Sequence, residues 1–529
     1  MKNAAGREIP DYIEGYGQVD PYKGAYVRLS RKEEHIDAKA VRSVRRGEKK
    51  LVTSVDEMLD KLDLHDGMTV SFHHHLRNGD YVTNLVMLAL AKRGIKGIHL
   101  APSGLFSCHD PIAPLIEDGT ISQISLSTIG PGAIARAISE GKLKKPAVFR
   151  SHGGRPYAIE TGRLHIDVAF IAAPSCDAYG NMNGCNGSSA CGCLSFSYAD
   201  ACYADCVVAI TDHLVPYPCC PAEIPETFVD YVLTVDQIGD PAGIASGAMQ
   251  VTKDEKKLAV AQRCVDFLDQ AGCIRQDMSF QTGVGGISLA VASKLRERMI
   301  EKGIQGSFGA GGITGYYIEM LEQGILRALW DVQCFDTTAI ANISKDPRHM
   351  VMSAAQYASP ASKSCVVDHL DVMILGALEV DTDFHLNVIT GSNGVILSAA
   401  GGNPDTAAGS KVSVIVSSLM KKGSTCLIKK AVTTVTTPGE TVDAVVTDYG
   451  IAINPRRTDL IEKIAGTNLP IVSINDLQKK GEELGDTNRQ PHLTSKIVAV
   501  VEYRDGTVLD VVHQVMPDET NHMMLKGEM

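Results

Sequence analysis

The sequence predicts an α/β protein built from two tandem, duplicated three-layer domains with mainly parallel sheets. The chain has 529 residues, which is too long for one ordinary hydrophobic core. Two stretches of it share one order of strand, loop and helix, and matching residues recur at a fixed spacing. Strand–helix–strand units this close together require right-handed crossovers, which produce parallel sheets covered by helices on both faces.

The repeat starts at two Ser-Phe pairs. Residues 71–104 read SFHHHLRNGDYVTNLVMLALAKRGIKGIHLAPSG, and residues 279–312 read SFQTGVGGISLAVASKLRERMIEKGIQGSFGAGG. Further along, Asp177 and Asp381 are 204 residues apart, as are Asn183 and Asn387. We therefore expect an N-terminal extension over 1–50, a first domain over 51–245 and a second over 246–529. A cleft between the two domains, at the carboxyl ends of their strands, is the expected place for a substrate.

Composition excludes several classes of protein. With 44% hydrophobic and 21% charged residues, the chain has the composition of a soluble globular protein, and no apolar run approaches the ~18 residues of a membrane helix. The net charge of −11 and the lack of a basic stripe argue against a nucleic-acid partner. The N-terminal residues lack the apolar segment of a signal peptide, so a cytoplasmic location is expected.

Fourteen cysteines are present, eight of them between Cys176 and Cys220. In the cytoplasm they need not form disulfides. Their spacing is irregular and differs from the paired knuckles of a zinc site, so small buried thiols are favoured over a metal site here. The sequence gives no metal ligands that we would assign.

Glycines mark one candidate site. The segment QTGVGG places Gly285 and Gly286 between a strand and a helix predicted over 287–302. Glycines at the start of a helix let a negatively charged group approach backbone N–H donors. The alternative is an ordinary tight turn, because a short glycine motif by itself is a weak signal.

Polar and cationic residues mark the matching loop of the first half, which carries His73, His74, His75, Arg77 and Asn78. Side chains alternate along an extended segment, so the three histidines cannot all face one ligand, and a metal bound by all three is improbable.

Two arginines, Arg77 and Arg155, are candidates to bind carboxylates, since a guanidinium matches the carboxylate fork. Ion pairs within the protein are the alternative for both. In the second half, Asn393, Gly401 and Gly402 are either turn residues or substrate contacts.

Several motifs resemble a known family. The chain is similar to the CoA-transferases in GVGG, GALEVD, GGNPD and VDAVVTDYGIA, at 283–286, 376–381, 401–405 and 442–452, and in DVAFIAAPSCDAYGNMNG at 167–184. Three further segments resemble the citrate lyase α chain within that superfamily: IEGYGQVDPYKGAY, SFHHHLRNGD and GAGGITGYYIEMLEQG, at 13–26, 71–80 and 309–324. Together the motifs cover most of residues 50–465.

The resemblance implies a citrate CoA-transferase that exchanges acetate for citrate on the thioester of an acyl carrier protein. Many CoA-transferases form a covalent glutamyl thioester, using a glutamate on the strand after the glycine-led helix. Here that strand is predicted at 303–308, and the glutamate position falls on Ser307. Citrate would then attack the thioester directly, with Gly285, Gly286 and Ser307 as the catalytic set.

The resemblance also implies partners. No cofactor is expected on this chain, because the thioester belongs to CoA or to a phosphoribosyl-dephospho-CoA group on a γ acyl carrier subunit. A β subunit would cleave the citryl thioester, and a homo-oligomer is expected. A transferase for malonate or citramalate, an acyl-CoA hydrolase and a non-catalytic citrate sensor remain alternatives.

Overall fold

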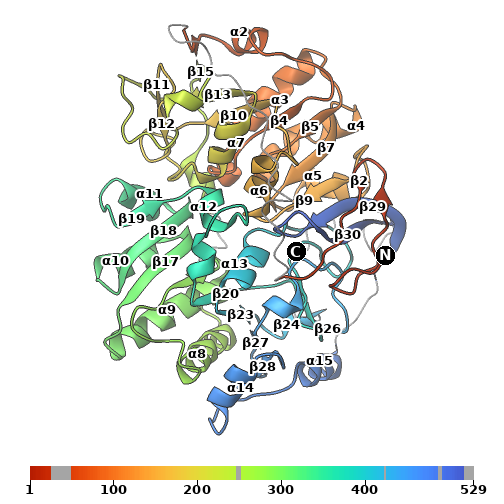
Figure 1. Cartoon of the computed structure of the whole chain (residues 1–529), viewed down its shortest axis with the longest axis vertical. Coiled ribbons are helices and arrows are strands. Elements are labelled where there is room, and N and C mark those ends of the chain that lie inside the picture. The colour runs from red at the N-terminus through yellow and green to blue at the C-terminus, as the bar shows by residue number, and fades with distance from the viewer. Residues whose placement is uncertain (26–48, 246–251, 422–424, 486–490, 517–529) are drawn as a thin grey trace.

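Two large sheets organise the chain in the computed structural model, which describes residues 1–25, 49–245, 252–421, 425–485 and 491–516. Figure 1 shows the first sheet in the upper half, coloured orange to yellow apart from two blue C-terminal strands at its edge, and the second in the lower half, coloured green to blue. Nearly all neighbouring strands in both sheets are parallel. The predicted α/β class with mainly parallel sheets is thereby confirmed.

The first sheet has ten strands among the described residues. Its order is β3 (Leu51–Val52), β15 (Tyr231–Thr234), β13 (Cys206–Thr211), β10 (Val168–Ala172), β4 (Thr69–Ser71), β5 (Ile98–Leu100), β7 (Ile121–Leu126), β9 (Ala147–Phe149), β29 (Leu493–Glu502) and β30 (Val508–Val515). Its strands are buried and rich in Val, Ile and Ala, as expected for a sheet covered on both faces.

The second sheet has eight strands among the described residues. Its order is β19 (His349–Val351), β18 (Leu326–Cys334), β17 (Gly306–Ile313), β16 (Phe280–Thr282), β20 (Val372–Leu375), β23 (Val412–Val416), β27 (Ala444–Val446) and β28 (Ile451–Ile453). Only β27 and β28 pair antiparallel in this sheet.

The strands at the two Ser-Phe pairs occupy equivalent positions in the two sheets, but the register differs from the predicted one by two residues. Thr69, rather than Ser71, is the counterpart of Ser279, since the two donate their backbone N–H groups to Asp167 and Asp371. β4 lies between β5 and β10, and β16 lies between β17 and β20. In each half, one neighbour is the next strand along the chain. The other neighbour is the strand that precedes Asp177 or Asp381. Each half also has a small three-stranded sheet, and the pairing in these two sheets corresponds. Ser175 pairs with Asn183 in one, and Glu379 with Asn387 in the other, at the predicted spacing of 204. This order is what the sequence repeat predicts, and the duplication itself remains an inference.

Helices cover the faces of the sheets. In the first half these are α2 (Val55–Asp60), α3 (Val82–Lys92), α4 (Pro114–Glu117), α5 (Ala133–Ser139), α6 (Gly154–Glu160) and α7 (Tyr198–Tyr203). In the second half they are α8 (Glu255–Gln270), α9 (Gly286–Glu301), α10 (Gly315–Glu322), α11 (Thr337–Ile343), α12 (Ala354–Ala358), α13 (Asn403–Gly409), α14 (Thr458–Ile464) and α15 (Ile474–Glu483). The described helices include none with the length and apolar composition needed to cross a bilayer.

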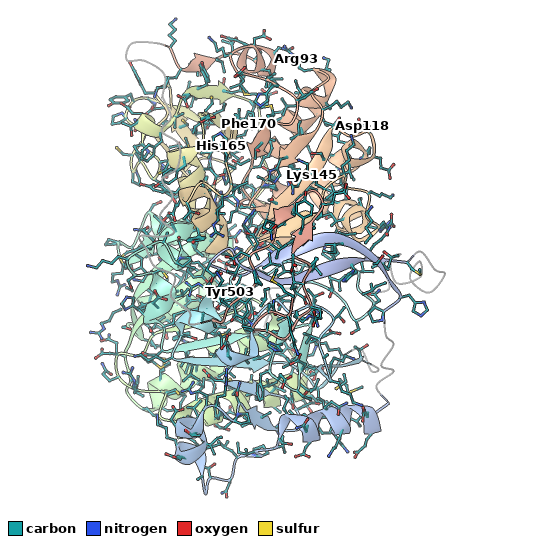
Figure 2. The ribbon with its side chains drawn as sticks, turned by 45° about the vertical axis from the view of Figure 1, so that its right-hand side comes forward. Arg93, Asp118, Lys145, His165, Phe170 and Tyr503 are labelled. Carbon is teal, nitrogen blue, oxygen red and sulfur yellow. The ribbon has the colours of Figure 1, made fainter. Side chains whose placement is uncertain are left out.

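The C-terminal hairpin joins the sheet of the first half. β29 runs parallel to β9, although the sequence division places residues 493–515 in the second domain. The N-terminal segment packs on this hairpin, since Tyr22 and Tyr503 are in edge-to-face contact at 4.9 Å and Arg7 pairs with Asp510 at 2.8 Å. Tyr503 lies near the level at which the two halves meet (Figure 2). The N-terminal segment and this hairpin therefore lie at the junction between the halves, where the second-half residue Val435 donates its backbone N–H to Asp510 at 2.7 Å.

Candidate functional site

Aromatic and imidazole rings gather at the carboxyl ends of first-sheet strands, where ligands bind in open α/β sheets. His74 follows β4 and His152 follows β9, and their rings lie 4.5 and 4.8 Å from the ring of Phe196. The two imidazoles are 5.9 Å apart. His75 lies beside them, with its ring centre 6.0 Å from that of Phe196. This ring cluster is the core of the candidate site.

His74 presents one hydrogen-bond donor that has no partner. Its Nδ1 lies 2.7 Å from the Ser103 hydroxyl, which also accepts the His74 backbone N–H at 3.0 Å. The Ser103 hydroxyl therefore donates its own proton to Nδ1, and the imidazole proton of His74 is on Nε2. In the described part of the chain, His74 Nε2 is buried without a hydrogen-bond partner. Burial, then His152, lowers the pKa of His74 well below its usual value, so the ring is a neutral donor.

His152 has the opposite tautomer. The Ser127 hydroxyl donates to the Ser103 carbonyl oxygen at 2.9 Å, so it accepts from His152 Nδ1 at 3.0 Å. The lone pair of His152 then lies on Nε2. Burial, and after it the charge of Arg77, lowers the pKa of His152 to about 3. The site thus contains a neutral donor and a neutral acceptor side by side.

Arg77 supplies positive charge beside the ring cluster. Its guanidinium lies over two rings, 5.0 Å from the centre of Phe106 and 4.9 Å from that of Phe335. Burial lowers its pKa to about 10, so it stays protonated at neutral pH. Among the described residues no carboxylate forms a salt bridge with it. An unpaired, partly buried cation requires an anion to compensate its desolvation, and a carboxylate ligand provides one.

Backbone strain at Arg77 supports this reading. Its φ of 52° lies in the left-handed region, which is unfavourable for a long side chain. Such strain persists where the surrounding structure enforces it, often at a ligand site.

The second half closes the site with its glycine loop. Gly401 accepts the His152 N–H at 2.8 Å and donates to the Ser127 carbonyl at 3.0 Å, so it bridges two of the first-sheet loops. A side chain at Gly402 would meet the Tyr357 hydroxyl at 2.7 Å. That hydroxyl accepts from Gln281 Nε2 at 2.8 Å. Gly401 and Gly402 therefore lie at the ring cluster, as their predicted substrate-binding role requires.

Gly285 and Gly286 begin a helix, as predicted. α9 spans Gly286–Glu301, within one residue of the expected helix, and Gly285 caps it without a side-chain hydrogen bond. A side chain at Gly285 would have no atom within 4 Å. The helix N-terminus is therefore open to a negatively charged ligand at the carboxyl end of β16.

Ser307 lies at the wrong end of its strand. The strand β17 runs from Gly306 to Ile313, whereas the sequence analysis predicted residues 303–308. Ser307 stands second in it, and its hydroxyl donates to the Met278 carbonyl at 3.2 Å. The carboxyl end is formed by Gly311 to Ile313, about 13–20 Å further on at 3.3 Å per residue. The catalytic assignment of Ser307 is therefore corrected, because ligands bind at the carboxyl end.

No residue of β17 carries a carboxylate, since the strand reads GSFGAGGI. Near its carboxyl end, Gly311 has a φ of 93°, and a side chain there would collide with the Gln281 amide. A glutamate cannot take this place while Gln281 occupies it.

Arg155 is also not free to hold a substrate. Its guanidinium is buried and donates twice to Asp200, at 2.7 Å each. It also donates to the Ala101 carbonyl at 2.9 Å. Burial favours the neutral acid, but Arg155 and then His73 lower the pKa of Asp200 below its usual range. The predicted substrate contact is replaced by a buried ion pair, which supports His73 at 3.2 Å from Asp200.

The remaining predicted residues shape nearby loops. His75 Nε2 accepts the Phe196 backbone N–H at 3.3 Å, and Asn78 Oδ1 accepts the Cys108 N–H at 3.0 Å. Asn393 Oδ1 accepts from the Val395 N–H at 3.2 Å, in a turn that packs on the C-terminal hairpin. Their contacts with a substrate stay predictions.

Several contributors were not singled out by the sequence analysis: Phe106, Ser103, Ser127, His152, Phe196 and Phe335. A signal existed for His152, because it directly follows a strand as the three consecutive histidines do. The serines and phenylalanines carry no local signal, since their roles depend on contacts between distant loops.

Comparison with known proteins identifies the family. The model of the citrate lyase alpha subunit family matches residues 48–515. The chain belongs to the citrate lyase alpha subunit family. It is 42% identical to the citrate lyase alpha chain of Klebsiella pneumoniae over 468 residues, which is 88% of this chain and 92% of that one. The alpha chain of Escherichia coli K12 is also 42% identical, over 88% of this chain and 91% of its own.

Solved structures agree with this assignment. A structure from Streptococcus mutans, described as an alpha subunit of citrate lyase in complex with citrate, has a TM-score of 0.93 and 44% identity, and covers 97% of this chain and 100% of its own. A Pseudomonas malonate decarboxylase hetero-tetramer in complex with malonate matches at a TM-score of 0.61 and 16% identity, over 83% of this chain and 90% of that one. The second likeness shows a shared fold alone.

Proposed function

We propose that this chain is a citrate CoA-transferase, which exchanges acetate for citrate on the thioester of an acyl carrier protein. The observation that carries the proposal is Arg77, an unpaired cation between two aromatic rings beside the donor of His74 and the acceptor of His152. A citrate carboxylate would pair with Arg77, and another citrate oxygen would accept from His74 Nε2. The citrate named with the Streptococcus mutans relative supports this choice of ligand.

The reaction needs no protein nucleophile. A citrate carboxylate attacks the acetyl thioester, forming a mixed anhydride and releasing the carrier thiolate. The thiolate then attacks the citryl carbonyl, which forms the citryl thioester and releases acetate. Both steps pass through an oxyanion, for which the N–H groups of Gly285 and Gly286 are the proposed donors, each worth about 3 kcal/mol. The strand β17, without a carboxylate, supports this direct route.

The exchange itself is the test. Acetyl carrier protein, or acetyl-CoA as its surrogate, should yield a citryl thioester and free acetate when citrate is added. Incubation with the acyl donor alone, followed by hydroxylamine or borohydride, should leave no adduct on the chain in an intact-mass measurement. Sequential kinetics should accompany this result. A trapped glutamyl adduct with ping-pong kinetics would overturn the direct mechanism, and citrate binding without exchange would favour the sensor.

His74 offers a second test, because it is the unpaired donor. His74→Phe keeps the ring contact with Phe196 and removes the Nε2–H. We expect kcat/KM for citrate to fall about 10- to 150-fold, the loss that follows removal of one hydrogen bond to a charged ligand. His65→Phe, at an exposed histidine before β4, serves as the control and should change citrate kinetics little. Unchanged citrate kinetics in His74→Phe would remove His74 from the mechanism.

Related substrates and partners remain part of the proposal. Malonate and citramalate also carry carboxylates, so they are the rival acceptors, and exchange rates measured with each would separate them. A γ acyl carrier subunit would supply the thioester through CoA or its phosphoribosyl-dephospho derivative. A β subunit would consume the citryl product, and a homo-oligomer is expected.

A further inference from the structure

A second cluster of reactive side chains lies next to the ring cluster and shares no residue with it. Asp331 and Cys334 belong to β18 and His349 to β19, while Cys193 comes from the cysteine-rich segment of the first half. Asp331 Oδ2 is 3.0 Å from His349 Nε2 and 2.9 Å from Cys334 Sγ. Cys193 follows Gly192, where an added Cβ would meet the Cys334 sulfur, so the Cys193 thiol comes from a segment packed on Cys334. All four side chains are buried.

We propose that these four residues bind one zinc ion. Two thiolates, one imidazole and one carboxylate are a ligand set that suits a closed tetrahedral zinc site. The potential ligand atoms of Asp331, Cys334 and His349 all lie within 4.8 Å of one another, and the Cys193 thiol, which is outside this group of three, would move toward them to complete the tetrahedron. Zinc bond lengths of about 2.0–2.3 Å place neighbouring ligand atoms roughly 3.4–3.8 Å apart. The three atoms therefore need to separate by about half an ångström to admit the ion.

The surroundings orient the ligand atoms as metal sites do. His349 Nδ1 lies 3.1 Å from Asn342 Oδ1, which accepts the ring proton and leaves the Nε2 lone pair toward Asp331. Asp331 Oδ1 accepts the Gln333 backbone N–H at 2.7 Å, so Oδ2 is the oxygen left for the cluster. Two electron-rich atoms 3.0 Å apart require a proton or a cation between them. In metal centres, a ligand residue typically forms a hydrogen bond through the atom that does not bind the metal, as Nδ1 of His349 and Oδ1 of Asp331 do here.

Sequence reasoning missed this cluster because its residues come from both halves. Spacing within the cysteine-rich segment gave no zinc pattern, and the proposed site takes only Cys193 from there. The ion would join the halves beside the ring cluster, since Gln333 Nε2 donates to the His74 carbonyl at 3.2 Å. On binding, two zinc–sulfur bonds form and two thiol protons leave to solvent, so affinity should rise with pH.

The test uses the full chain purified after growth with zinc. We expect about one zinc per chain by elemental mass spectrometry, and a lower melting temperature after the ion is removed with a chelator. Replacing zinc with cobalt(II) should produce a thiolate-to-cobalt charge-transfer band. Cys334→Ser and His349→Gln should lower the metal content at least tenfold, whereas Cys220→Ser, at an exposed thiol, should retain it.

The proposal is overturned if the wild-type chain binds no stoichiometric zinc and gives no thiolate band with cobalt(II). A band that keeps its full intensity in the double variant Cys193→Ser, Cys334→Ser would also overturn it, because the thiolates would then belong to other cysteines. If Cys334→Ser fails to fold, His349→Gln decides, because its metal content and its cobalt(II) band should both fall at least tenfold.

Discussion

Arg77→Met should lower kcat/KM for citrate about 10- to 150-fold. This corresponds to the roughly 1.5–3 kcal/mol of a hydrogen bond to a charged group. Methionine keeps apolar contact with the rings of Phe106 and Phe335, so the loss reports the missing charge. Steady-state kinetics with citrate varied at fixed thioester, and then the reverse, separate the two substrates. The KM for the thioester should change little.

Two control variants sharpen this result. Arg77→Lys keeps the charge without the planar fork and should recover part of the activity. Arg93→Ala removes an arginine whose partners, Asp56 and Asp60, are at the surface, and should leave citrate kinetics intact. If Arg77→Met raises only the KM for the thioester, the loop around Arg77 contacts the prosthetic group of the carrier protein. The assignment of Arg77 to citrate is then wrong.

Arg155→Met should destabilise the fold by about 3–5 kcal/mol, because Asp200 would keep a buried charge without its bidentate partner. Urea unfolding followed by circular dichroism measures the change in the free energy of unfolding. A substrate contact, by contrast, would change citrate kinetics and leave stability alone.

The double variant Arg155→Met, Asp200→Asn is the matched control. It removes the orphaned charge, so it should recover a large part of the lost stability. Arg155→Met with wild-type stability and a raised KM for citrate would restore the role predicted from sequence. His73 lies 3.2 Å from Asp200 and can compensate part of the unpaired charge in Arg155→Met. Replacing His73 in the Arg155→Met background would measure how much stability this contact provides.

The sequence by itself determined the α/β class, the repeated order of strand, loop and helix along the chain, and the positions of the loops that carry the glycines and histidines. Periodicity, turns and internal repeats are local features, so the helix that begins at Gly286 and the strand ends near Ser71 and Phe280 could be predicted closely. The missing glutamate could also be inferred, although the alignment placed it at Ser307 rather than at the carboxyl end of β17.

Only the tertiary structure decided which polar groups are free to bind a ligand. Arg77 and Arg155 look alike in sequence, but Asp200 neutralises Arg155, whereas no described carboxylate pairs with Arg77. The tautomers of His74 and His152 depend on Ser103 and Ser127, which belong to other loops. The cluster around Asp331 likewise combines both halves. Pairing and burial arise from contacts between residues far apart in the chain, and local sequence patterns do not encode them.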